Sequence, residues 1–170
     1  MTTIEPLTPE GFPLVARWLS SPELNGWLTS EWRGRTIEPS LLAVASRNKR
    51  NRLYLVRLDG APVGLVALAD IDLADRCAMI WYALGERGQG GRGIISDAVN
   101  ALCRQAFAEL GLASLHAWIM RPNEGSRRVL QRNGFREAGA LRAATTCHGE
   151  PVDRVYFDLL PGELAPPRGA

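Results

Sequence analysis

The stretch "ERGQGGRGIISDAVNALC", which runs from Glu86 to Cys103, places four glycines within six residues just ahead of a helical pattern. Apolar residues recur there at every third or fourth position, which predicts a helix from about Ile94 to Leu110. The glycines then form a loop at the positive end of that helix, where exposed backbone N–H groups attract phosphate. A tight turn without a ligand would need fewer glycines and no Arg92. We therefore interpret the segment as a phosphate-binding loop.

Two common phosphate loops do not fit this segment. Gly88-x-Gly90-x-x-Gly93 spells a dinucleotide fingerprint, but that fold needs its glycines after the first strand of a βαβ unit and an acidic residue about 20 positions later. Here a predicted hairpin and a third strand precede the loop, and the next strand ends at Met120-Arg121-Pro122 without a carboxylate. A nucleoside-triphosphate loop is disfavoured as well, because no Lys-Ser or Lys-Thr follows the glycines.

Composition describes an ordinary globular chain. Its 170 residues, 46% hydrophobic and 22% charged, suit one domain, which we place at 1–160, followed by a mobile tail at 161–170. We expect a cytoplasmic protein without a membrane partner, because there is no long apolar run and no signal-peptide pattern. The net charge of +2 does not indicate nucleic acid binding. Three cysteines without a CxxC pair argue against a disulfide framework and against a metal site.

Strand and helix patterns alternate along the chain in the order β-α-α-β-β-β-α-β-α-β-β, which predicts a mixed α/β sheet flanked by helices. A hairpin is predicted at Asp59-Gly60, and a last one around His148-Gly149. Asn123 is placed to cap a short helix that ends at Gly134. The region from 22 to 51 is irregular, apart from a helix around 41–47.

Four stretches carry a resemblance to the GNAT superfamily of acyl-CoA-dependent N-acyltransferases: "GGRGIISDAV" (90–99), "AFAELGL" (106–112), "NEGSRRVLQRNGF" (123–135) and "HGEPVDRVYFDLL" (148–160). The match departs from the family loop at Gly90, where Gln or Arg is usual, and at Ile95, where a small residue is usual. The G-x-G-I-I-S variant resembles the branch of ribosomal-protein N-terminal acetyltransferases. The resemblance implies a mostly antiparallel central sheet and an N-acetyltransferase with acetyl-CoA as the acyl donor.

By that resemblance, the pantetheine arm of the coenzyme lies along the strand before the loop, and the diphosphate rests on the backbone of the loop. Arg127, Arg128 or Arg132 would meet the nucleotide's phosphates, and Arg92 would add a charged contact. Each of these arginines could equally be a solvated surface residue. The predicted coenzyme contacts are Tyr82, Ala83, Leu84, Gly88, Gln89, Gly90, Gly91, Arg92, Gly93, Ile94, Ile95, Asn123, Arg127 and Arg128.

The catalytic residues implied by the resemblance are Asn123 and Ser126. A backbone N–H near Tyr82 would stabilise the oxyanion, and Asn123 would hold the arm or a water molecule while also capping its helix. Many relatives place a tyrosine seven residues after that asparagine as the acid for the leaving thiolate, but this chain has Leu130 there. Ser126 is the substitute, although a serine hydroxyl is a weak acid and could be only a surface residue.

The acceptor side is the least family-like part of the chain. Trp27 and Trp32 are candidates for the wall of the acceptor pocket, with buried core aromatics as the alternative. Glu31 and His116 are candidate residues of the acceptor side. The proton of the amine could be removed by Glu31, His116, Asp70 or His148, or by a chain of water molecules. A covalent route through Cys147 is disfavoured, because nothing in the sequence supplies an activating partner.

The acceptor is therefore expected to be a small primary amine or a protein N-terminus, and family members often form homodimers. A different class of function stays open at this point: a coenzyme A-binding sensor or partner domain without catalysis, which Leu130 and the missing base would suit.

Overall fold

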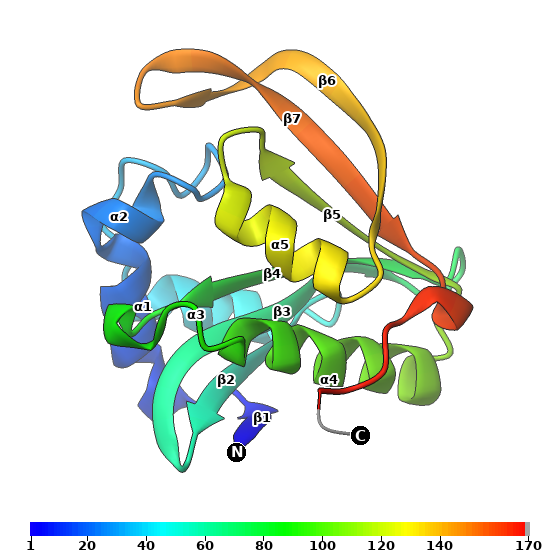
Figure 1. Ribbon diagram of the computed structural model, residues 1–170. Helices are drawn as coiled ribbons and strands as arrows, with labels where there is room; N and C mark the ends of the chain where they lie inside the picture. Colours follow the sequence, from blue (N-terminus) through cyan, green and yellow to red (C-terminus); the bar gives the residue numbers. More distant parts are fainter. Residues whose placement is uncertain (169–170) are drawn as a thin grey trace.

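A single mixed sheet of seven strands runs through the computed structural model, which describes residues 1–168 (Figure 1). Its strand order is β1-β2-β3-β4-β5-β7-β6, and every neighbouring pair is antiparallel except β4 and β5. The predicted mixed, mostly antiparallel sheet is confirmed. The strands are β1 (Thr2–Pro6), β2 (Arg52–Leu58), β3 (Ala61–Asp72), β4 (Cys77–Leu84), β5 (Ser114–Met120), β6 (Arg136–Cys147) and β7 (Glu150–Leu159).

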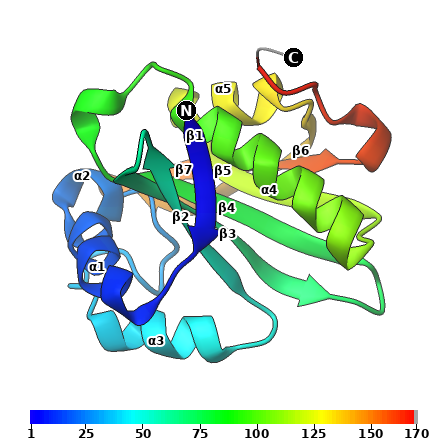
Figure 2. The same cartoon turned by 90° about the horizontal axis from the view of Figure 1, so that it is seen from below.

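Helices cover both faces of this sheet, as Figure 2 shows for α3 and α4 on opposite sides. They are α1 (Phe12–Ser20), α2 (Pro22–Asn25), α3 (Pro39–Arg47), α4 (Ile94–Leu110) and α5 (Glu124–Arg132), with short 3₁₀ helices at Pro9–Gly11, Arg87–Gln89 and Pro161–Glu163. The predicted element order is present, and α2 is an addition to it. Four residues are too few to produce a helical periodicity, so α2 left no signal in the sequence.

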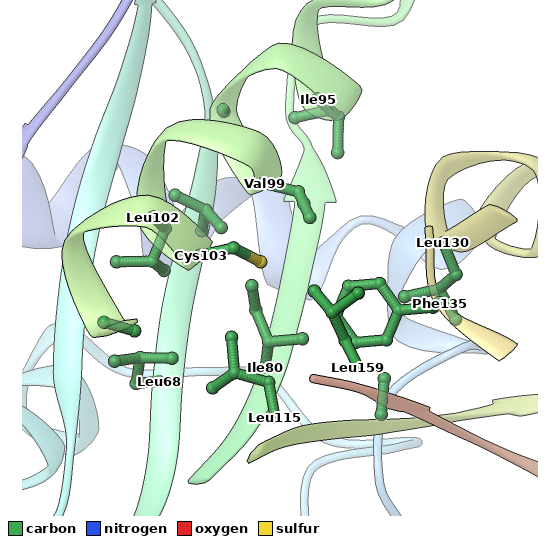
Figure 3. Close-up of a cluster of buried hydrophobic side chains, with 14 of the residues drawn as sticks. Leu68, Ile80, Ile95, Val99, Leu102, Cys103, Leu115, Leu130, Phe135 and Leu159 are labelled. Carbon is green, nitrogen blue, oxygen red and sulfur yellow. The ribbon is translucent and has the colours of Figure 1, made fainter. Parts of the chain in front are cut away.

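Each face of the sheet has its own apolar core. On one face, α4 packs its buried positions against β3, β4 and β5, and Leu130 of α5 and Phe135 close the cluster (Figure 3). On the other face, α1 and α3 bury Leu19 and Leu42 against β2 and β3. Because both faces are covered, the central strands are apolar on both sides, which explains their nearly continuous hydrophobic sequence.

Both predicted hairpin turns are present. Asp59 and Gly60 have φ angles of 49° and 86°, and His148 and Gly149 have φ angles of 50° and 86°. Two consecutive positive φ values match the right-handed twist of the flanking strands, and the glycine adopts its value without steric strain. These two turns set the registers of β2 with β3 and of β6 with β7.

The C-terminal segment packs against α4 and α5. Leu164 joins the apolar core of the α4 face, and Ala165 exchanges main-chain and side-chain hydrogen bonds with both helices. The sequence predicts a mobile tail at 161–170. The described part of this tail, 161–168, makes the contacts given above, and the last two residues lie outside the described range. No helix within residues 1–168 is long and apolar enough to cross a membrane.

Candidate active site

The strands β4 and β5 separate within the sheet. Their register consists of three pairs, the last of which joins Met79 to His116, yet β4 continues to Leu84 and β5 to Met120. Beyond Met79 the backbone of β4 has a partner on the β3 side and none on the β5 side. Polar main-chain groups on an open strand edge are available to pair with an extended ligand. The predicted stretch Tyr82–Leu84 lies on this edge.

A cavity of about 260 Å³ opens where the two strands part. Residues of β4, β5, the start of α5 and the irregular segment between α1 and α3 line it together. Five predicted site side chains meet there, since Trp27, Glu31, Trp32, Asn123 and Ser126 all belong to its wall. Tyr82 and Ala83 also line the cavity.

The glycine loop joins the end of β4 to α4 and exposes its main chain. The first N–H that bonds along α4 is that of Asp97, which donates to the Gly93 carbonyl at 2.9 Å, so the N–H groups of Ile94, Ile95 and Ser96 in the first turn have no acceptor within the helix. A Cβ added at Gly91 would meet nothing within 4 Å, so the space beside the loop is open. Gly93 has a φ of 81° and directly precedes α4. The loop therefore offers a row of free donors at a helix N-terminus, which fits a diphosphate.

The side chains of the loop contribute less than its backbone. Ile94 and Ile95 are buried in the core, so only their main-chain N–H groups are directed to the loop. The Arg92 guanidinium donates a hydrogen bond to the Gln89 side chain, within the loop itself. A Cβ at Gly88 would also lie in open space.

Asn123 and Ser126 are positioned by a helix cap. The Asn123 Oδ1 accepts a hydrogen bond of 3.0 Å from the backbone N–H of Ser126, which confirms the predicted N-cap of α5. The Asn123 Nδ2 and the Ser126 hydroxyl have no partner among the described residues, and both side chains line the cavity. One amide group therefore caps the helix with its oxygen and leaves its two N–H donors free.

Tyr82 bridges the gap between β4 and α5. Its hydroxyl donates a 3.0 Å hydrogen bond to the Ser126 carbonyl, so both main-chain groups of Ser126 are held. Burial raises the pKa of Tyr82 above its usual range, and the phenol stays protonated at neutral pH. Sequence reasoning had assigned Tyr82 for its backbone alone and missed this hydroxyl.

The acceptor side of the cavity is an aromatic wall. Trp32 meets Trp81 edge to face with ring centroids 6.1 Å apart, and Trp27 meets His148 at 6.2 Å in the same geometry. Trp118 of β5 completes the wall. Trp81 and Trp118 were not predicted as site residues. The alternation of side chains along β4 and β5, which turns both indoles away from the α4 core, is the sequence signal that could have indicated them. Among the described residues lining the cavity, Glu31 alone is charged, and its side chain is exposed.

Two side chains hold the irregular segment in place. The buried Asn25 side chain donates to the carbonyls of Leu19, Trp32 and Arg35 and accepts from the Gly34 N–H. Arg33 donates to the Thr145 hydroxyl at 3.3 Å and to the Thr146 carbonyl at the far end of β6. These contacts fix a segment that composition alone describes as a loop.

The other predicted acid–base residues lie off the cavity wall. His116 is on β5, two positions before Trp118, and is not among the lining residues. Burial lowers the pKa of His116, and the charge of Asp70 partly offsets this effect. Cys147 is a buried free thiol away from the lining residues. Within residues 1–168, no group of three His, Cys, Asp or Glu side chains is arranged to hold a metal ion.

The predicted arginines of α5 separate into two groups. Arg127 faces β6 and β7, where its guanidinium pairs with Glu137 at 2.7 Å and lies 5.6 Å from the centre of the Phe157 ring. The structure thus does not bring Arg127 to the glycine loop. Arg128 and Arg132 are exposed, with no ion pair in the described part of the chain. Leu130, at the position of the usual tyrosine, is fully buried in the core.

Comparisons with known proteins agree with this geometry. The chain is 36% identical over 105 residues to "Putative ribosomal N-acetyltransferase YdaF" of Bacillus subtilis, a match that spans 62% of this chain and 57% of that protein, little more than half its length. Its fold superposes on the Vibrio cholerae spermidine N-acetyltransferase with a TM-score of 0.84 at 17% identity, covering 95% and 96% of the two chains. Mycobacterium smegmatis RimJ gives a TM-score of 0.81 at 24% identity, covering 98% of this chain and 85% of RimJ.

Both structural matches establish the fold alone. The family model described as "Acetyltransferase (GNAT) domain" matches residues 2–136, which is most of the sequence. The glycine loop, the parted strands and this match together show that the chain belongs to the GNAT acetyltransferase family.

Proposed function

We propose that the protein is an N-acetyltransferase that moves an acetyl group from acetyl-CoA to a primary amine by direct attack on the thioester. The observation that carries this proposal is the gap between β4 and β5, along which the open edge of β4 runs from the cavity holding Asn123 and Ser126 to Leu84, where the glycine loop follows. Two similar proteins support the proposal: the Vibrio cholerae enzyme was solved with CoA and spermine, and M. smegmatis RimJ with a CoA disulfide.

The residues present fit the diphosphate and the pantetheine arm of CoA. The N–H groups in the first turn of α4, from Ile94 to Ser96, suit the diphosphate, and open space beside Gly88 and Gly91 leaves room for it. The open edge of β4 from Ile80 to Leu84 suits the amide-bearing pantetheine arm, which pairs as an added strand would. When bound, acetyl-CoA supplies the thioester carbonyl that the amine attacks.

The side chains around the gap have separate tasks in this proposal. A main-chain N–H on the open edge near Tyr82 donates to the developing oxyanion, and the free Asn123 Nδ2 steadies the reacting groups. Ser126, held by Tyr82 and Asn123, gives or relays a proton to the leaving sulfur. Because a serine hydroxyl is a weak acid, water shares this step.

The acceptor we propose is a cationic primary amine that enters past the tryptophans. Trp27, Trp32 and Trp81 favour an ammonium ion or its aliphatic chain, and Glu31 attracts the positive charge at the mouth. Proton removal then occurs through cavity water with Glu31 as the carboxylate at hand. Relatives named for ribosomal proteins and for spermidine both act on amines, so a protein N-terminus and a polyamine are the two acceptors to assay first.

The proposed compartment is the cytoplasm, since the three cysteines are free thiols. The predicted homodimer stays a prediction.

The test measures free thiol released from acetyl-CoA by the purified protein with spermidine, N-terminal peptides and free amino acids. We expect thiol release that depends on one amine class. Glu31→Gln should raise the KM for that amine about two- to fivefold and leave the KM for acetyl-CoA unchanged, because an ion pair of an exposed carboxylate contributes little. Tight CoA binding without turnover on any amine would favour the non-catalytic alternative, and absence of CoA binding would refute the proposal.

A further inference from the structure

The described part of the C-terminal segment, 161–168, is anchored so that Arg168 lies at the glycine loop. The Ala165 carbonyl accepts from Asn100 Nδ2 at 2.9 Å and from Arg104 Nη2 at 3.1 Å, and the Ala165 N–H donates to the Asn133 carbonyl at 3.2 Å. Just upstream, Glu163 pairs with Arg136 at 2.9 Å. These contacts fix the chain three residues before Arg168.

Arg168 lies directly against the loop. Its Nη1 donates to the Arg92 carbonyl at 3.1 Å and lies 3.7 Å from the Asp97 carboxylate. A Cβ built on Gly93 would fall 1.5 Å from the same Nη1, so the guanidinium occupies the space that the absent side chain leaves. The Nε and Nη2 donors of Arg168 have no partner in the described part of the chain.

A second cavity, of about 270 Å³, lies beside this arginine. Its polar floor is a network in which Asn133 Nδ2 donates to Ser96 and Asn133 Oδ1 accepts from Asn100 at 3.0 Å. The charged lining residues are Arg132, Arg168 and Asp97, which gives a net positive lining. The asparagine amides are engaged with one another, so the available donors of the cavity belong to the two arginines.

We propose that Arg168, delivered by the C-terminal segment and assisted by Arg132, binds a phosphate group at the nucleotide end of CoA. This inference rests on the proposed function, since it assumes that the coenzyme occupies the loop. A guanidinium with free donors beside unpartnered backbone N–H groups is complementary to phosphate oxygens. The diphosphate and the 3′-phosphate of CoA share this chemistry, and an experiment separates them.

The experiment measures CoA binding by calorimetry with the wild type, Arg168→Gln, Arg168→Lys and a control, Arg52→Ala, which changes an exposed arginine on β2. The ligands are CoA and 3′-dephospho-CoA. We expect Arg168→Gln to raise the Kd for CoA about tenfold, Arg168→Lys to lose less, and Arg52→Ala to match the wild type.

Each outcome bears on the proposal. An equal loss with both ligands assigns Arg168 to the diphosphate, whereas a loss confined to CoA assigns it to the 3′-phosphate; either result supports the proposal. Wild-type affinity of Arg168→Gln for both ligands overturns it, as does a loss that does not shrink when salt is raised, because screening weakens a charged contact. If the wild type itself binds no CoA, the proposed function fails first, and this inference fails with it.

Discussion

The two roles of Asn123 can be separated by substitution. Its Oδ1 caps α5 through the Ser126 N–H, and its free Nδ2 faces the cavity. Asn123→Ser and Asn123→Asp keep an oxygen that can accept this hydrogen bond, but both lose the N–H donors. Asn123→Ala loses the cap and the donors together.

The expected magnitudes differ for the two roles. Loss of an N-cap costs about 1 kcal/mol of folding free energy, or about 2–4 °C in Tm for a chain of this size. The Ser and Asp variants should therefore stay within about 0.5 kcal/mol of the wild type, while Asn123→Ala falls by about 1 kcal/mol. Loss of the donor should lower kcat about ten- to hundredfold in Asn123→Asp and Asn123→Ala, equivalent to about 1.4–2.7 kcal/mol of transition-state stabilisation, and less in Asn123→Ser, whose hydroxyl can still donate.

Urea unfolding supplies the stabilities, and the rate of thiol release from acetyl-CoA supplies kcat. Asn123→Asp is the decisive variant, because its carboxylate keeps a cap and has no hydrogen-bond donor. If it is as active as the wild type, Asn123 is a structural cap alone and the assignment of its amide to the reacting groups is refuted. If kcat falls only in proportion to the loss of unfolding free energy in each variant, the same conclusion follows.

Three further outcomes are expected. Tyr82→Phe removes the hydrogen bond to the Ser126 carbonyl, so it should lower stability by about 1 kcal/mol and kcat several-fold, with an unchanged KM for acetyl-CoA in steady-state assays. Leu130→Ala should cost about 2–5 kcal/mol in urea unfolding, and Leu130→Tyr should cost about 1–3 kcal/mol without raising kcat, because this position is fully buried. The pKa of His116 is lowered in the fold, so its unfolded form binds a proton first as pH falls; stability is retained above about pH 6.5 and declines below it. His116→Gln should flatten that decline in thermal melts taken across this range, and an unchanged pH profile would contradict the assignment.

Local sequence patterns predicted most helices, strands and turns of this fold, because the residues that determine each of these elements lie close together in the chain. The Asp59-Gly60 turn, the glycine loop and the Asn123 cap each depend on neighbouring residues, and all three are present. The family resemblance supplied the sheet type, which periodicity alone could not. The missed α2 is too short to show any period.

The candidate site was predictable only in part, since much of it depends on contacts between distant segments. Ser126 and Tyr82 are 44 positions apart, and Arg168 and Arg92 are 76 positions apart. Alternation along the strands indicates the sheet face of Trp81 and Trp118, but no local pattern shows that β4 and β5 part after Met79, so it does not indicate that a cavity forms beside them. The ion pair of Arg127 with Glu137 could not be predicted for a related reason, because Glu137 comes from the following strand; contact of Arg127 with the coenzyme stays a prediction.

The parting of β4 from β5 also affects how the protein avoids self-association. Unpaired strand edges invite addition of a strand from another molecule and are usually confined to the margins of a sheet, where charge or a bulge protects them. Here the exposed edge lies in the middle, and the Trp27–Trp32 segment together with the start of α5 covers the space beside it. Deletions in that segment should therefore produce aggregates as well as inactive enzyme, which links solubility to the integrity of the acceptor pocket.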